Sequence, residues 1–260
     1  LAMSVLQRRA ASCTYSLLRS LERRRERLHG FIDALLADEM TESAFQARQQ
    51  AMHLADTETE KTGEEEQGEE GREEQETTEN DAMGATSSGS LSDLQTELEK
   101  VEALVVKAQR VYDLGEEAKF ARLQGVINDP SFANEKLLIF TEHVDTLRYL
   151  QGQLEALGYT GQVAAIHGGM DDDALLAEIE KFRTTHRFMI GTDAAGEGIN
   201  LQFCWIMVNY DIPWNPARIE QRFGRIHRYG QKHDKVVLVN LVAKNTREGK
   251  VLKTLLDKLE

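Results

Sequence analysis

The chain has little cysteine and no long apolar segment. Its two cysteines, Cys13 and Cys204, lie far apart and lack the spacing of metal ligands. This excludes a disulfide framework, predicts no metal site, and favours a reducing compartment, so we expect a cytoplasmic protein. No apolar run approaches the roughly 20 residues that span a bilayer, and the first residues do not have the pattern of a signal peptide. We therefore expect no membrane association.

Acidic charge is concentrated in one segment. The formal net charge is −13, and thirteen acidic residues but only two basic ones lie between Asp56 and Asp81. The range 56–90 also lacks aromatic and branched apolar residues, so it cannot form a packed core and we expect a disordered loop. The rest of the chain is close to neutral, which is compatible with a local basic groove that binds nucleic acid.

Helical periodicity lies on both sides of this loop. Apolar residues recur at three- and four-residue spacing in the range 91–115, beginning with Leu91 and Leu94. The range 1–55 has a similar pattern, with a break expected at Gly30. We expect the two segments to pair as a helical protrusion, which could bind a protein partner. Its many arginines suit either a basic arm on nucleic-acid phosphates or a solvated helix face, and we favour the solvated face.

Strands and helices alternate in the range 116–260. Short apolar runs predict strands at 137–140, 163–166, 187–190, 205–208 and 236–242. A helical pattern at 118–127 precedes the first strand, further helical patterns lie between the strands, and a closing helix is expected at 246–259. This alternation is typical of an α/β domain with a parallel sheet and helices on both faces.

Polar residues follow the predicted strands at the points where they end. Thr141 follows the first strand, His167 and Gly168 follow the second, and the cluster Gly191-Thr192-Asp193 follows the third. The carboxyl ends of parallel strands share one edge of the sheet, and open α/β sheets bind their ligands there. We expect these residues to lie together.

An arginine-rich segment at 211–231 follows the fourth predicted strand. Arg222, Arg225 and Arg228 are spaced by three, so a helix starting near Pro216 would align them along nearly one face. Aligned guanidinium groups repel one another, and an anion with several oxygens would relieve the repulsion through bidentate hydrogen bonds. A solvated basic face is the alternative, but the segment follows a buried strand in an acidic chain.

The same segment resembles motif VI of the superfamily 2 helicases in its Swi/Snf-type form. The matching residues are Asp211, Trp214-Asn215-Pro216, Gln221, Gly224-Arg225, His227-Arg228 and Gly230-Gln231. The range 191–202 resembles motif V of the same superfamily, and 138–143 resembles motif IV. The resemblance covers about residues 118–260 and implies the second RecA-like lobe of a two-lobe motor.

The resemblance also implies roles for individual residues. Arg225 and Arg228 would act as arginine fingers on the γ-phosphate of ATP, and Gln221 would position the nucleotide or water. Gly198 and Asn200 would lie beside the ribose and phosphates. The residues implied on the nucleic-acid backbone are Thr141, His167, Gly168 and Thr192. Glu197 departs from the pattern, since DEAD-box relatives commonly carry arginine there.

The first-lobe motifs that bind ATP are not found in this sequence. Gly249-Lys250 is followed by valine and lacks the upstream glycine of a phosphate-binding loop, and no acidic pair follows an apolar strand. ATP and Mg²⁺ are therefore expected to be bound mainly by an absent first lobe, and this fragment alone is not expected to hydrolyse ATP. The chain begins with Leu1, and we read it as part of a longer polypeptide.

The expected function is that of a motor lobe that translocates on duplex DNA. A strand-separating DNA or RNA helicase is an alternative, because nothing in the lobe excludes it. A second alternative is a non-catalytic module that binds nucleic acid or a protein partner through the helical protrusion. The retention of both Arg225 and Arg228 argues against the second alternative.

Overall fold

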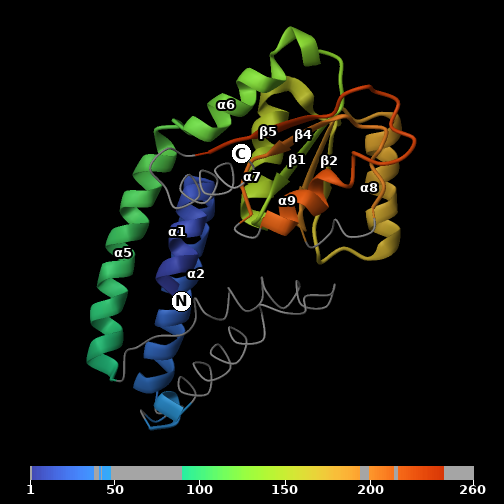
Figure 1. The fold of residues 1–260 in the computed structure, drawn as a ribbon. Coiled ribbons are helices and arrows are strands. Elements are labelled where there is room, and N and C mark those ends of the chain that lie inside the picture. The colour runs from blue at the N-terminus through green and yellow to red at the C-terminus, as the bar shows by residue number, and fades with distance from the viewer. Residues whose placement is uncertain are drawn as a thin grey trace. The chain divides into compact units, whose positions relative to one another are not determined.

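The computed structural model describes residues 2–37, 41, 43–47, 90–193, 199–213 and 216–242. The chain divides into two compact units (Figure 1). One combines Leu1–Ala10 with Thr14–Gly115 and is called the helical unit here; the other combines Ala11–Cys13 with Glu116–Glu260 and is called the α/β lobe. The acidic loop, except for Ser90, and the predicted closing helix at 246–259 lie outside the described residues.

Helices α1 (Ala2–Ser12), α2 (Thr14–Leu36) and α5 (Leu91–Asp113) form the described core of the N-terminal region. The predicted break at Gly30 is wrong, because α2 runs through this glycine. Glycine costs only about 1 kcal/mol inside a helix, and the buried side chains of Leu28 and Ile32 on either side hold this helix to its neighbour. The helical pattern is interrupted at Cys13 instead.

Helices α2 and α5 pack against each other through an apolar seam. The buried members of this seam are Leu18, Leu21, Leu28, Ile32, Leu94, Val101, Val105 and Ala108. A salt bridge between Arg24 and Glu97 joins the two helices beside the seam. Ser90 caps α5, and its hydroxyl oxygen accepts a hydrogen bond from the amide of Asp93.

The α/β lobe is built on a five-stranded sheet in which every pair is parallel. The strands are β1 (Leu137–Thr141), β2 (Val163–Ile166), β3 (Phe188–Thr192), β4 (Ile206–Asn209) and β5 (Val237–Asn240). Their order is β2-β3-β1-β4-β5, so β1 lies in the centre (Figure 1). The predicted strands and the parallel α/β fold are confirmed. Strand β1 is buried along its whole length, as its unbroken apolar sequence predicts.

Helices cover both faces of the sheet. The elements are α6 (Ala118–Ile127), a short 3₁₀ turn (Pro130–Phe132), α7 (Val144–Leu154) with a π turn after it (Glu155–Tyr159), α8 (Asp172–Thr184) and α9 (Pro216–Phe223). Ile179 and Phe182 of α8 pack with Leu138 and Phe140 on one face. Side chains alternate along a strand, so Leu137 and Ile139 point to the other face, and α7 packs on β1, β2 and β3. The predicted helix at 118–127 is confirmed.

Candidate functional site

The polar residues predicted at the strand ends lie along one edge of the sheet. Thr141 and Thr192 are directly opposite each other in the register of β1 and β3, and Asn209 pairs with Phe140 one residue earlier. His167 and Gly168 follow β2, and Asp211 follows β4. The fold therefore places the carboxyl ends of four neighbouring strands at a common edge, where an α/β sheet binds its ligands.

The two threonines at this edge turn their hydroxyl groups inward. Thr141 is fully buried, and its hydroxyl donates a hydrogen bond of 2.5 Å to the carboxylate of Asp211. Thr192 is also buried, and its hydroxyl oxygen has no hydrogen-bond partner among the described residues. Contact of either residue with nucleic acid stays a prediction. Contact through the Thr141 hydroxyl requires this hydrogen bond to break.

His167 is better placed for contact with a phosphate. The residue is half-buried, and burial together with the nearby positive charge of Arg148 lowers the pKa of its imidazole. Its Nδ1 atom accepts a hydrogen bond of 3.3 Å from the amide of Gly169, so the proton of the neutral ring is assigned to Nε2. A neutral His167 can thus donate one hydrogen bond to a phosphate oxygen.

The arginine segment does not form a single helix. Helix α9 ends at Phe223, and two turn hydrogen bonds follow it, from the amide of Arg225 to the carbonyl of Arg222 and from Ile226 to Phe223, both 3.1 Å. The prediction that Arg222, Arg225 and Arg228 share one helix face is therefore wrong. The chain tightens at Gly224, and each arginine has a different environment.

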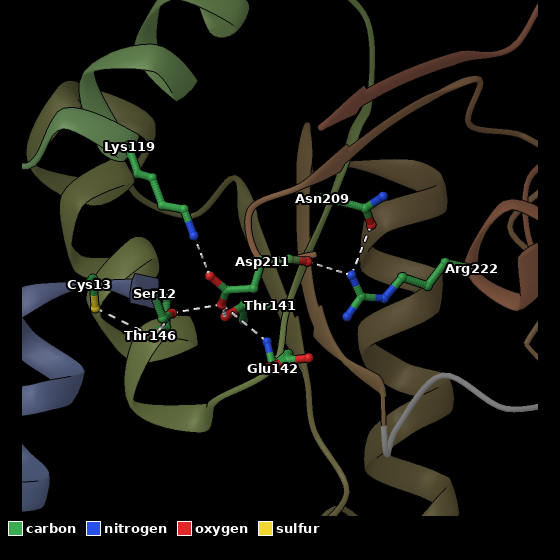
Figure 2. Close-up of polar contacts among 9 residues, drawn as sticks. All are labelled: Ser12, Cys13, Lys119, Thr141, Glu142, Thr146, Asn209, Asp211 and Arg222. Atoms are coloured by element: carbon green, nitrogen blue, oxygen red, sulfur yellow. Dashed lines mark hydrogen bonds and ion pairs between the residues drawn. The ribbon is translucent and has the colours of Figure 1, made fainter. Parts of the chain in front are cut away.

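Arg222 is fully buried and forms the centre of an ion-pair network. Its guanidinium binds Asp193 in a bidentate manner at 2.6 and 2.7 Å. Nη1 also donates to the Asn209 side chain at 2.9 Å and to the Asp211 carbonyl at 2.8 Å (Figure 2). Burial acts to raise the pKa of Asp193, but the charge and hydrogen bonds of Arg222 outweigh it, and the pKa is lowered. Arg222 thus fixes the start of the arginine segment, and its guanidinium is buried out of reach of a ligand in solution.

Arg225 and Arg228 differ in exposure. Arg225 is 5% exposed, and its guanidinium lies 5.8 Å from the ring centre of Phe140. Arg228 lies on the surface, where its Nε atom donates to the carbonyl of Gly224 at 2.8 Å. Gln221 is also exposed, on α9. Arg228 and Gln221 are thus accessible from solvent, whereas the side chain of Arg225 is not.

Asn200 lines a cavity of about 380 Å³. The other lining residues are Arg183, Gln202, Phe203, Gly230, Gln231, Lys232 and His233. Three of these side chains are basic types and several are amides, so the cavity suits an anionic or strongly polar ligand. Among the predicted nucleotide contacts, Gly198 lies outside the described residues.

The Gly230-Gln231 pair has a structural role that the sequence did not reveal. The side-chain amide of Gln231 donates to the carbonyls of Cys204 and Ile226 at 3.0 and 2.9 Å, and its oxygen accepts from the amide of Lys232 at 2.8 Å. Gly230 has a φ of 99°, which glycine adopts without strain. Hydrogen bonds of Gln231 fix the C-terminal end of the arginine segment, and those of Arg222 fix its beginning. Arg228 therefore lies between two residues that are held in place.

The described residues offer neither a metal centre nor a membrane-spanning helix. No group of His, Cys, Asp and Glu in this part of the chain could hold a metal ion. The helices of the same residues include none that is long and apolar enough to cross a membrane.

Comparison with known proteins agrees with this arrangement. Residues 118–230 match the helicase conserved C-terminal domain. An uncharacterized ATP-dependent helicase of Bacillus subtilis, YqhH, is 44% identical over 126 residues, covering 48% of this chain and 22% of that protein. The ATP-dependent RNA helicase DBP8 of Candida glabrata is 30% identical over 125 residues, covering 48% of this chain and 28% of that protein. The chain thus spans less than a third of the length of these two relatives.

A solved structure shares the fold. The crystal structure of the C-terminal part of the Fun30 ATPase domain matches 64% of this chain and 59% of its own, with a TM-score of 0.50 and 23% identity. The parallel sheet, the strand-end residues and the arginine segment define a RecA-like lobe. The α/β lobe is thus similar in sequence to the helicase conserved C-terminal domain, and it shares its fold with the matched part of the Fun30 ATPase domain.

Proposed function

We propose that this lobe belongs to a Swi/Snf-type motor that hydrolyses ATP and translocates on duplex DNA. The observation that carries the proposal is the unequal placement of the three arginines. Arg222 is neutralised inside the lobe, Gln231 anchors the far end of the segment, and Arg228 between them is exposed. The backbone around Arg228 is fixed on both sides while its guanidinium is exposed, and such an arginine is suited to bind an anion held by another domain.

ATP, when bound by the first lobe, supplies the phosphoryl group that is transferred to water. Arg228 then stabilises the charge that develops on the γ-phosphate, and such an arginine is worth roughly 10³–10⁵ in rate in phosphoryl-transfer enzymes. Arg225 joins it after turning out from beside Phe140. Gln221 on α9 positions the nucleotide or the water, and Asn200 reaches the ribose side. Mg²⁺ prefers carboxylate and phosphate oxygens, so we assign its ligands to the absent lobe.

Nucleic acid would bind along the carboxyl edge of the sheet. His167 donates from Nε2 to a backbone phosphate, and Gly168, with no side chain, lets the strand approach closely. Contacts of Thr141 and Thr192 would use the backbone or follow a rearrangement of their buried hydroxyls. These contacts go to phosphates, so they bind without reading sequence, as a translocating motor requires.

Duplex DNA is preferred to RNA because of the Trp214-Asn215-Pro216 and Gly230-Gln231 pattern around the arginines. The rival is a strand-separating helicase or RNA motor, supported by the 30% identity to a yeast RNA helicase. The deciding experiment measures ATP turnover by the longer natural polypeptide without nucleic acid and with duplex DNA, single-stranded DNA or RNA. Stimulation by duplex DNA supports the proposal. Stimulation by single strands or RNA supports the rival, and no turnover under any condition overturns both.

A further inference from the structure

Asp211 is a buried carboxylate that is contacted by three separate parts of the chain. Its side chain is 1% exposed. One oxygen accepts from the Ser12 hydroxyl at 2.7 Å and from Thr141 at the end of β1, and the other pairs with the ammonium of Lys119 on α6 at 2.8 Å (Figure 2). The amide of Glu142 adds a hydrogen bond of 3.2 Å. A buried charge is tolerated when it is paired and hydrogen-bonded in this way.

The contacts through Ser12 continue as a chain of hydrogen bonds. Ser12 gives its single hydroxyl proton to Asp211, so the hydroxyl of Thr146, at 2.7 Å, donates to Ser12. Cys13 lies 3.5 Å from the same threonine oxygen and can donate to it in turn. All three donors point toward the carboxylate, and each hydrogen bond polarises the next. The segment Ala11–Cys13 is thereby part of the lobe.

The chain passes between the units at three places, and Ser12 and Lys119 lie close to them. It enters the lobe after Ala10, leaves it after Cys13 and returns at Glu116. Asp211 therefore binds Ser12, which lies between the first two crossings, and Lys119, which lies just after the third. Its backbone carbonyl also accepts from Nη1 of Arg222, which fixes the arginine segment. One residue joins the attachment points of the helical unit to the segment that carries Arg225 and Arg228.

We propose that Asp211 is a positioning residue that couples the attachment of the helical unit to the placement of the arginine segment. The helical unit then acts as a regulatory element. A mechanical load or a protein partner bound to this unit displaces Ser12 or Lys119, and Asp211 transmits the displacement to the arginine segment. Coupling of this kind needs a contiguous packed network, which the buried contacts supply. The consequence for turnover rests on the proposed function, while the consequence for the arginine segment does not.

The test uses the longer natural polypeptide and three matched variants. Ser12→Ala removes the hydroxyl that meets Asp211. Thr146→Val is isosteric and removes the donor one step further from the carboxylate. Ser20→Ala is the control, because Ser20 is equally buried and accepts a hydrogen bond of 2.9 Å from Arg9, but it lies wholly within the helical unit. All three lose one buried hydroxyl, so their effects on melting temperature should be similar.

The first measurement is hydrogen exchange of peptides that cover residues 216–226, which needs no ATP turnover. Ser12→Ala should raise their exchange about fivefold, Thr146→Val less, and Ser20→Ala not at all, since coupling energies between sites begin at about fivefold effects. The second measurement is steady-state turnover, in which Ser12→Ala should lower kcat about fivefold and leave KM for ATP unchanged. Exchange and kcat equal in Ser12→Ala and Ser20→Ala would overturn the inference. If the unmodified polypeptide shows no turnover, the proposed function fails, and the exchange result still decides whether Asp211 positions the segment.

Discussion

The helical unit and the α/β lobe bury polar groups in different ways. In the helical unit, α2 and α5 meet through an apolar seam, and the Arg24–Glu97 salt bridge lies beside it with side chains 11% and 20% exposed. In the lobe, the Arg222–Asp193 and Lys119–Asp211 pairs lie at the functional edge of the sheet, with Arg222 and Asp211 each 1% exposed. A buried ion pair seldom makes a protein more stable than apolar packing would. We therefore infer that these two pairs serve to hold Arg222 and Asp211 in fixed positions.

The largest effect that this comparison predicts is on catalysis. In the longer natural polypeptide, Arg228→Ala should lower turnover by roughly 10³-fold or more, because an arginine finger acts on the transition state. Folding stability should stay within about 0.5 kcal/mol, since Arg228 is exposed. Steady-state kinetics and thermal melting measure the two quantities. A parallel loss of nucleic-acid affinity would show instead that Arg228 contacts the backbone.

Arg222→Ala should have the largest effect on stability. The substitution leaves Asp193 buried without its partner, and breaking a buried pair costs about 3–5 kcal/mol. Arg24→Ala in the helical unit should cost about 1 kcal/mol, because Glu97 remains partly hydrated. Urea unfolding of the 260-residue chain gives both values, with exposed Arg122→Ala as a control. Equal losses of unfolding free energy from Arg222→Ala and Arg24→Ala would contradict the proposed difference between the ion pairs of the two units.

The lobe should lose stability in acid. Burial opposes ionisation of Asp211, but Lys119, His143 and the hydrogen bonds to Lys119 and Thr141 lower its pKa well below the ordinary value of 3.8. A depressed folded-state pKa contributes stability that is present above the unfolded-state value and disappears as the pH falls through the folded-state value. Unfolding free energies measured at pH 7, 4 and 3 should therefore drop mainly below pH 4. Asp211→Asn should reduce this pH-dependent loss of unfolding free energy. An unchanged dependence on pH would show that other carboxylates cause the loss.

The smallest predicted effect concerns His167. Its pKa is lowered in the free lobe, and a phosphate beside Nε2 would favour the charged ring and raise the pKa. NMR titration with and without duplex DNA should show this increase. His167→Ala should weaken DNA binding about two- to fivefold, because one phosphate contact among several is lost. If the pKa of His167 is the same with and without bound DNA, the DNA backbone does not pass beside the end of β2.

Most of the sheet could be predicted from sequence because its strands are short apolar runs bounded by polar or glycine residues. Strand β1 illustrates this, since every residue in it is buried and its sequence is apolar except for the final threonine. The common edge followed from parallel topology alone. The predicted alignment of the arginines is wrong because it extends a local pattern. Spacing by three aligns arginines on one face only if the helix continues, and α9 ends at Phe223.

The remaining errors and omissions involve partners distant in sequence. Arg222 is separated from Asp193 by 29 residues, and Ser12 from Asp211 by 199. No periodicity reports such pairs, because they exist only after strands from different parts of the chain are brought together. Asp211 is visible in the sequence as part of the motif VI resemblance, but its residue type gives no sign of which cation it would bind. Gly30 similarly predicted a break that the packing of α2 overrides.

The interleaved course of the chain has a consequence for biosynthesis. Ser12 emerges from a ribosome 199 residues before Asp211, and at about 5–20 residues per second the delay is roughly 10–40 s. During that time α2 and α5 can already pair, because both are complete by Asp113. Pairing shortens the effective loop that must close when Ser12 meets Thr146 and Asp211. We therefore expect the nascent helical hairpin to act as a preformed spacer that speeds completion of the lobe.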